Sequence, residues 1–421
     1  MSSRRSFLKK IGIQSAALTA LPMISPASLP ELRQSLPAQG EGENFWSGIQ
    51  EAYSVSRSKI NLNNGGVSPQ PRFVQEAFEK YMAMSNEAPS YYMWRQLEPS
   101  RINIRRDLAN LLGCTYDEVV INRNTTEALD TVIFGLDLKK GDEIVLSPYD
   151  YPNMRNAWEQ RKKRDEIVLR YANFELPSAS EDEIVQAFEN EMSAKTKLVH
   201  ITHMINYNGQ VLPAGRIATA ARKYSSMVLV DGAHSFAHVP FKISDIDCDF
   251  FGTSLHKWLC APFGTGMLYI KKAMISKLWA WAPTDAIADD DIRKFEALGT
   301  RSVPSEVAVG QAILFHNNIG SDRKYERLQW LTDYWTVEFE GDEKFISYTP
   351  KREKRYGALY TFGISGMKAN EIANYLQQKY QIITSPISWK NIEGCRVSPH
   401  IYTSVSELEK LKEGIRNLLK K

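Results

Sequence analysis

Residues 227–257 read MVLVDGAHSFAHVPFKISDIDCDFFGTSLHK and contain the two strand ends that decide the fold. The apolar run 227–230 predicts a buried parallel strand that ends at Asp231. A second short strand, predicted over 248–252, runs on into Lys257. Open α/β sheets bind ligands at the carboxyl ends of their strands. The stretch therefore delivers an acid and a lysine to one ligand-binding edge.

An acid and a lysine placed in this way suit the chemistry of pyridoxal 5′-phosphate (PLP). That cofactor needs a lysine for its Schiff base and a carboxylate that keeps its pyridine nitrogen protonated, so that the ring acts as an electron sink. Asp231 would be the carboxylate and Lys257 the lysine. Each residue alone has an ordinary alternative, as a helix cap or a solvated loop lysine. Their combination with the Ser-x-His-Lys ending favours the catalytic interpretation.

The segments VDGAHS (230–235) and TSLHKW (253–258) resemble the class V aminotransferase group of fold-type I PLP enzymes. This group includes cysteine desulfurases, kynureninases and isopenicillin N epimerase-like proteins, and the resemblance runs from about Asn61 to the end of the chain. It implies an α/β protein of the PLP-dependent transferase fold type I, with a mostly parallel sheet covered by helices and a smaller C-terminal α+β domain. The alternation of predicted strands and helices favours the same layered sheet.

Length and composition are those of an ordinary soluble globular protein. The 421 residues suffice for one large and one small domain, and 43% are hydrophobic and 24% charged. A net charge of +3 without a long basic run indicates neither nucleic acid nor an anionic membrane surface as a partner. None of the four cysteines has the spacing of metal ligands, so we expect buried free thiols and no metal site.

The N-terminus predicts export. Residues 1–28 are interpreted as a twin-arginine signal peptide, because SRRSFLK at 3–9 precedes an apolar run over 11–24. That run is too short, and too interrupted by polar residues and Pro22, for a stable membrane span. The expected partner is the twin-arginine export machinery, and the expected location is the periplasm or another exported compartment. This route accepts folded proteins, which suits an enzyme that loads its cofactor in the cytoplasm.

The rest of the chain divides into three expected parts. Residues 29–60 form a linker and N-terminal segment, in which the stretch rich in Pro, Gln, Gly and Glu at 29–44 is the linker proper. A large PLP-binding domain is expected over 61–285 and a small C-terminal domain over 286–421.

The segment VVINRNTTEALDTVIFGL (119–136) predicts a phosphate site. Asn124 and Glu127 have the form of a capping box, which by itself indicates only a well-capped helix. A helix start also offers free N–H groups and the positive end of the dipole, which suit a phosphate. The family binds its cofactor phosphate here. The resemblance implies phosphate contacts from Thr125, Thr126, Ser254 and His256, and from Thr300 across the interface of an obligate homodimer.

Three further residues match the family's contacts to the cofactor ring. Tyr151 follows a predicted strand at the position from which an aromatic or histidine ring stacks on PLP. Asn206 matches the residue that hydrogen-bonds the 3′ oxygen, and His234 matches another contact to this oxygen, commonly a glutamine in cysteine desulfurases. Turn positions for Tyr151 and Asn206 are the ordinary alternative.

The expected substrate is a small amino acid. Arg396 matches the family's arginine that clamps the substrate carboxylate, a task for which a planar guanidinium is suited. Asn64 and Gly65 lie in a turn that resembles the loop at the substrate entrance of the epimerase-like branch. The alternatives are an exposed strand arginine and a simple Gly-rich turn.

The resemblance implies that Lys257 removes the Cα proton of the bound amino acid as general base. Return of the proton at C4′ gives an aminotransferase, and return at Cα from the opposite face gives an epimerase. The alternatives are a C–S lyase of a cysteine-derived substrate and a non-catalytic binding protein with the PLP fold. Persulfide-forming desulfurase activity is disfavoured, since none of the four cysteines falls in the loop that the desulfurases use. The overall similarity favours the isopenicillin N epimerase-like branch, but it does not indicate that this protein acts on the substrate of that branch.

Overall fold

The computed structural model describes residues 42–177, 180–283, 285–350 and 355–421. The predicted signal peptide and most of the predicted linker lie outside these ranges. Helix α3 (Gly42–Glu51) begins inside the 29–44 stretch, because Phe45, Trp46 and Ile49 form a buried apolar face there. No helix within the described ranges is long and apolar enough to cross a membrane.

A seven-stranded sheet forms the centre of the molecule, in the order β2-β8-β7-β6-β5-β3-β4. Its strands are β2 (Val119–Asn122), β3 (Glu143–Leu146), β4 (Val168–Tyr171), β5 (Thr196–Thr202), β6 (Met227–Asp231), β7 (Phe250–Ser254) and β8 (Gly266–Ile270). The pairings of β8 with β2 and with β7 are antiparallel, and the other pairings in this sheet are parallel, so β8 alone runs against the direction of the other six strands. The mostly parallel sheet expected from the sequence is thereby confirmed. Strand β7 lies two residues later than predicted, which places Ser254 at its carboxyl end.

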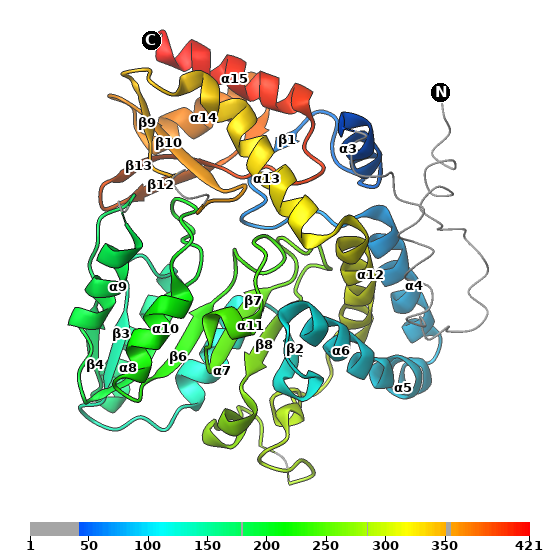
Figure 1. The fold of residues 1–421 in the computed structure, drawn as a ribbon. Helices are drawn as coiled ribbons and strands as arrows, with labels where there is room; N and C mark the ends of the chain where they lie inside the picture. The colour runs from blue at the N-terminus through cyan, green and yellow to red at the C-terminus, as the bar shows by residue number, and fades with distance from the viewer. Residues whose placement is uncertain (1–41, 178–179, 284, 351–354) are drawn as a thin grey trace.

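Helices cover both faces of this sheet, as Figure 1 shows. In β6, Leu229 belongs to one apolar core, while Val228 and Val230 belong to the other. Helices α7 (Thr125–Gly135) and α8 (Pro152–Asp165) pack on the Leu229 face. The opposite face is covered by α6 (Arg101–Leu112), α9 (Glu181–Asn190), α10 (Ala214–Arg222) and α12 (Val303–Ile319). Alternation along each strand thus produces a three-layered body.

The C-terminal part forms a second body above the large sheet (Figure 1). Its antiparallel sheet has the order β12-β13-β10-β9 and packs with three helices in its own apolar core. The elements are β9 (Phe345–Ser347), β10 (Tyr360–Ile364), β12 (Ser385–Trp389), β13 (Ile392–Val397), α13 (Ser321–Thr336), α14 (Ala369–Tyr380) and α15 (Val405–Leu419). Strand β1 (Ile60–Asn61) pairs in parallel with β11 (Ile382–Ile383), so the chain touches this body before it enters the large one.

Helix α12 follows the division predicted between residues 285 and 286, yet it packs along α4 (Arg72–Glu87) and α6. Its residues Val309, Ala312 and Ile313 enter the core of the large sheet. The smaller body therefore begins with α13. The remaining short helices are α5 (Pro89–Tyr91), α11 (Ile243–Ile246) and a π-helix over Tyr92–Leu97. Short 3₁₀ helices lie at Glu98–Ser100, Tyr116–Glu118, Lys272–Lys277, Ile292–Phe295 and Val337–Phe339.

Candidate active site

A cavity of about 280 Å³ lies where the carboxyl ends of β5, β6 and β7 meet the start of α7 and strand β13. It is lined by Gly65, Gly66, Asn124, Thr125, Thr126, Tyr151, Met154, Thr202, Asn206, Asp231, Ala233, His234, Ser254, His256, Lys257 and Arg396. All of the site residues predicted from the sequence are in this set except Asn64 and Thr300. Segments from both bodies are thus brought together around one space.

Asp231 ends β6 and is almost fully buried at the floor of the cavity. Its Oδ1 accepts a hydrogen bond of 2.9 Å from the backbone N–H of Ala233, which fixes the carboxylate. Burial raises the pKa of Asp231, while the nearby Lys257 and His200 oppose that rise. A buried carboxylate facing a cavity suits a ligand that brings a positive charge or an N–H donor.

Lys257 follows β7, and its Nζ lies 3.4 Å from Nε2 of His234. Within the described ranges it forms no ion pair with a carboxylate. Burial lowers the pKa of Lys257 to about 8, and the positive charge of Arg396 acts in the same direction. A sizeable fraction of this amine is therefore neutral, and able to react, near physiological pH.

The lowered pKa of Lys257 predicts how the apoprotein captures PLP. Only the neutral amine attacks an aldehyde, so the capture rate should rise with pH and level off above about 8. Stopped-flow absorbance between about pH 6 and pH 10 measures this rate. An unperturbed lysine, with its pKa near about 10.4, would instead give a rate that keeps rising to pH 10. That result would contradict the desolvated environment described for Lys257.

The start of α7 forms a cradle that fits an anion. The backbone N–H of Thr125 donates to Oγ of Ser254 at 2.9 Å, and the two side-chain hydroxyls are 2.7 Å apart. Asn124 caps the helix by accepting a 2.9 Å bond from the N–H of Glu127. Thr126 and His256 complete this side of the cavity. Hydroxyls and the positive end of a helix dipole at one place suit a phosphate group.

Arg396 reaches the cavity from β13 and is held on two sides. Its two terminal nitrogens donate to the carbonyl of Asn206 at 2.9 Å and to Oδ1 of Asn63 at 3.0 Å. Burial lowers the pKa of Arg396 to about 10, so the guanidinium stays charged at neutral pH. No carboxylate in the described part of the chain pairs with it, and its Nε has no hydrogen-bond partner there. A buried, uncompensated guanidinium suits a ligand carboxylate.

Gly65 and Asn64 contribute differently from what the sequence suggested. A Cβ on Gly65 would lie 3.5 Å from Cζ of Arg396, so the glycine leaves room beside the guanidinium. The Asn64 side chain does not reach the lining of the cavity in the described structure. Its Nδ2 donates to the carbonyl of Ser398 at 2.9 Å, and its Oδ1 accepts from the hydroxyl of Tyr402 at 2.7 Å. Asn64 therefore fastens the entrance loop to the smaller body, and its side chain is not placed to contact a substrate.

Thr300 is exposed and lies outside the cavity lining of the single described chain. The segment that carries it is anchored by Arg301, which forms a 3.3 Å ion pair with Glu306 and donates to the carbonyl of Ile121 at 3.1 Å. A contact from Thr300 to the phosphate across a dimer interface stays a prediction.

Sequence reasoning missed a second buried carboxylate beside Asp231. The Oδ1 of Asp150 accepts a 2.6 Å bond from the hydroxyl of Thr202, and Oδ2 accepts a 2.6 Å bond from the N–H of Ser147. Burial nevertheless raises the pKa of Asp150 to about 7. Thr202 ends β5 and pairs in register with Asp231. The strand-end rule that identified Asp231 could also have identified Thr202.

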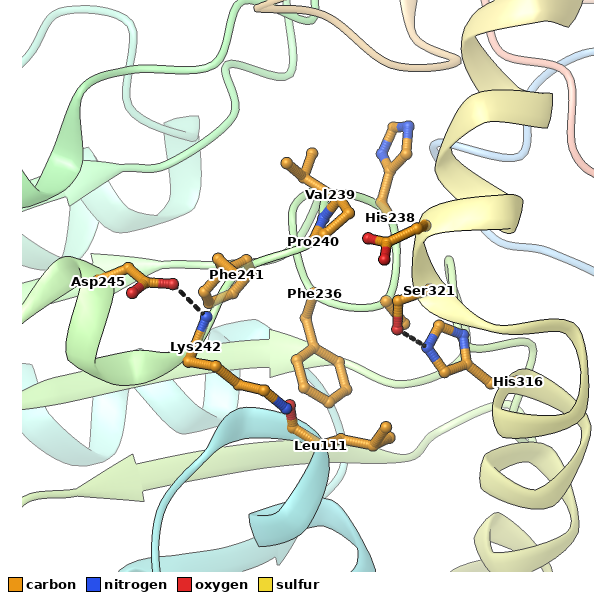
Figure 2. A pocket seen from close by; sticks show the side chains of 12 residues that line it. Leu111, Phe236, His238, Val239, Pro240, Phe241, Lys242, Asp245, His316 and Ser321 are labelled. Atoms are coloured by element: carbon orange, nitrogen blue, oxygen red, sulfur yellow. Dashed lines mark hydrogen bonds between the residues drawn. The ribbon is translucent and has the colours of Figure 1, made fainter. Parts of the chain in front are cut away.

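Figure 2 shows another cavity, of about 370 Å³, formed by the loop after His234 and the α12–α13 junction. Its polar groups bond to each other: the backbone N–H of Lys242 donates to Asp245 at 2.8 Å, and His316 contacts Ser321 at 3.0 Å (Figure 2). None of the predicted site residues lines it. The candidate active site is therefore the smaller cavity.

The residues of the smaller cavity fit PLP. They supply an amine, a buried carboxylate, an anion cradle and the aromatic ring of Tyr151. Two buried polar atoms of the cavity lining, Nδ1 of His234 and Oδ1 of Asn206, have no hydrogen-bond partner in the described ranges and can bond to polar atoms of the cofactor. Those ranges also contain no cluster of three His, Cys, Asp or Glu residues placed to hold a metal ion.

A family model, similar proteins and similar solved structures all relate this chain to PLP-dependent enzymes. Residues 60–411 match the family model described as aminotransferase class-V. The chain is 28% identical over 396 residues to an isopenicillin N epimerase of Amycolatopsis lactamdurans, covering 89% of this chain and 99% of that protein. It is also 28% identical over 402 residues to a probable cysteine desulfurase of Halalkalibacterium halodurans, covering 87% and 96%. A solved structure of C-DES with glycine covalently linked to its PLP cofactor has a TM-score of 0.75 at 21% identity, covering 85% and 96%.

Proposed function

The chain belongs to the class V aminotransferase family of PLP-dependent enzymes, and from this premise we propose that it removes the Cα proton of an amino acid, as an epimerase or an aminotransferase. When bound, PLP supplies an aldehyde that joins to an amino group and a ring that takes up electrons. The chain's own side chains hold the substrate and transfer the Cα proton, and the aminotransferase outcome also consumes water and needs a 2-oxo acid as amino acceptor.

One observation carries the proposal: the Lys257 amine and the Arg396 guanidinium face the same cavity, and neither pairs with a carboxylate in the described ranges. Arg396 holds the carboxylate of the amino acid through two parallel hydrogen bonds. Lys257, with its pKa lowered to about 8, takes the Cα proton as general base. Asp231 is placed to hold positive charge on the cofactor ring, and the rise in its pKa caused by burial is opposed by the N–H of Ala233 and by Lys257. Return of the proton to Cα from the opposite face gives epimerisation, and its return to C4′ of the cofactor gives transamination.

The cysteines support proton transfer over persulfide chemistry. All four lie within the described ranges as free thiols, and none lines the cavity. Cys395, next to Arg396 in sequence, donates from Sγ to Oγ1 of Thr384 at 2.9 Å, and burial raises its pKa to about 12. Such a thiol is not a ready nucleophile. The similarity to isopenicillin N epimerases favours the epimerase outcome, with the substrate left open.

Incubation with a panel of amino acids in heavy water tests this function. We expect deuterium to enter at Cα of the preferred amino acid, with either inversion at Cα or formation of the 2-oxo acid. Chiral chromatography and mass spectrometry distinguish the two products. Pyruvate and ammonia formed together with sulfide from cysteine, or with cysteine persulfide from cystine, and without inversion at Cα, would instead identify a C–S lyase. A protein that binds PLP and exchanges no Cα proton of any amino acid would contradict the proposal.

We propose in addition that the protein is a homodimer. Tyr151 is 42% exposed although it borders the cavity, and Phe263, in the loop that contacts His256 through the carbonyl of Thr265, is 60% exposed in the single chain. Large exposed aromatic side chains near a ligand site indicate a surface that another chain covers. The family resemblance implies that Thr300 of a second copy contacts the cofactor phosphate. Sedimentation equilibrium of the purified protein, which reports its mass in solution, tests this proposal.

We also propose export through the twin-arginine pathway, on the evidence of the SRRSFLK sequence at 3–9. Replacing Arg4 and Arg5 with lysine should leave active, PLP-loaded enzyme in the cytoplasm with its N-terminal segment uncleaved. Cell fractionation with an activity assay measures the location. Unchanged appearance of the double variant in the periplasm would mean that the twin-arginine machinery does not export it.

A further inference from the structure

A buried histidine lies behind Asp231 and is not used by the proposed reaction. His200, on β5, is fully buried, and its Nδ1 lies 2.9 Å from the indole Nε1 of Trp158. An indole N–H only donates hydrogen bonds, so Nδ1 of His200 must accept. The neutral ring therefore carries its proton on Nε2. Burial also lowers the pKa of His200 to about 4, so the ring is neutral in the working range of pH.

The Nε2–H of His200 has no hydrogen-bond partner within the described residues. A buried donor without a partner destabilises a fold, so its presence calls for an explanation. The strand register supplies one. His200 pairs with Leu229, and Thr202 pairs with Asp231, on adjacent parallel strands. Paired residues and those two positions apart share one face of a sheet, so Asp231 is the diagonal neighbour of His200. Asp231 is also the charged group whose field acts on His200.

We propose that His200 is a positioning residue for Asp231, whose Nε2–H presents positive potential to the carboxylate and keeps it ionised against the cofactor's pyridine nitrogen. Trp158 has a defined part in this arrangement, because its hydrogen bond selects the tautomer of the ring. The inference goes beyond the proposed reaction, and it rests on the assignment of Asp231 to the pyridine nitrogen.

The groups around Asp231 explain why such support matters. Lys257 and the N–H of Ala233 favour the ionised carboxylate, whereas burial and the second carboxylate, Asp150, oppose it. Loss of the His200 dipole shifts this balance toward a protonated Asp231. A neutral Asp231 no longer stabilises a proton on the pyridine nitrogen, so that nitrogen should lose its proton at a lower pH.

The experiment uses the holoenzyme loaded with PLP labelled with ¹⁵N in its ring. The ¹⁵N resonance reports the pH at which the pyridine nitrogen changes from protonated to neutral. His200→Leu should lower this midpoint by up to about one pH unit, less than a full hydrogen bond to a charged group would contribute, because Nε2–H acts on Asp231 through its field and not through a direct hydrogen bond. His200→Gln places an amide N–H where Nε2 was and should restore most of the wild-type midpoint. Thermal unfolding checks that each variant folds.

His203→Leu is the matched control. His203 directly follows β5, is also buried, and also has an unpartnered ring nitrogen in the described ranges, Nδ1. The ring centroids of His203 and Phe241 are 5.0 Å apart. Phe241 packs against the apolar core on one side of the sheet, and Trp158 belongs to the core on the other side. This variant should leave the midpoint unchanged. An equal shift from His203→Leu would attribute the effect to general disturbance of the strand and overturn the inference.

Asp231→Asn distinguishes the role proposed for His200 from the assignment of Asp231 to the pyridine nitrogen. If it lowers the midpoint while His200→Leu does not, the role of His200 is wrong and the assignment of Asp231 stands. If neither variant lowers it, the assignment of Asp231 fails, and the inference fails with it. If His200→Leu does not fold, Trp158→Phe is the second variant. It removes the hydrogen bond that keeps the His200 proton on Nε2, so it should shift the midpoint in the same direction by a smaller amount. An unchanged midpoint in a folded Trp158→Phe holoenzyme would also overturn the inference.

Discussion

Lys257→Ala is expected to remove turnover of every amino acid that the wild type uses, by at least about 10²–10⁴-fold. The amine is the base that takes the Cα proton, and no other side chain of the cavity replaces it. His234 lies beside the lysine, with Nε2 at 3.4 Å from Nζ. Burial holds the pKa of His234 well below its usual range, so it is a weak base.

Single-turnover and steady-state rates measure the effect, and thermal unfolding checks the fold. The control is Lys242→Ala, which removes a lysine that lines the other cavity and whose Nζ donates to the carbonyl of Leu111 at 2.9 Å. That variant should retain wild-type turnover. A Lys257→Ala enzyme with more than about a tenth of wild-type activity would show that Lys257 is not the base, since even one positioned acid or base contributes about a hundredfold.

Arg396→Ala is expected to lower kcat/KM by about tenfold to hundredfold. A hydrogen-bonded pair of opposite charges contributes roughly 1.5–3 kcal/mol, and ~1.4 kcal/mol corresponds to one decade in rate. The anchored carboxylate also fixes which bond at Cα is cleaved, so the variant should lose reaction specificity as well. PLP binding should stay near the wild-type level, because Arg396 is assigned to the substrate carboxylate and its contacts within the chain are the carbonyl of Asn206 and Oδ1 of Asn63.

The measurement compares kcat/KM, Cα exchange in heavy water and visible absorbance for the wild type and the variant. Arg396→Lys serves as the second variant, since it keeps the positive charge and loses the planar fork. Its kcat/KM should fall between those of the wild type and Arg396→Ala. Equal kinetics for all three proteins would mean that the substrate carboxylate binds elsewhere.

The parts of the fold and site that local sequence specifies were predicted well. Continuous apolar runs predicted the strands, because buried parallel strands have apolar residues on both faces. The alternation of strands and helices predicted a sheet covered by helices on both sides. The family of the chain and its PLP cofactor, both inferred from VDGAHS and TSLHKW, are confirmed by the comparisons. The cavity also gathers most of the predicted site residues in one place.

The parts that depend on distant contacts were not predictable from one sequence. The sequence predicted Asn64 in a turn at the substrate entrance, and only its hydrogen bonds to Ser398 and Tyr402 show that it ties this loop to the smaller body. The support of Asp231 by His200 depends on the register of β5 against β6, which the hydrophobic pattern of either strand does not specify. Helix α12 joins the large core through packing on α4 and α6, so no change in composition marks the division between the bodies.

Reduction of the purified protein with borohydride, followed by peptide mass spectrometry, tests the central claim most directly. PLP joined to a lysine absorbs visible light, and borohydride makes the linkage permanent. The account predicts that the yellow colour is lost on reduction and that the cofactor's mass is found on the peptide containing Lys257. A cofactor adduct on any other lysine, or a colourless protein with no adduct, would contradict the assignment of Lys257 and of the site built around it.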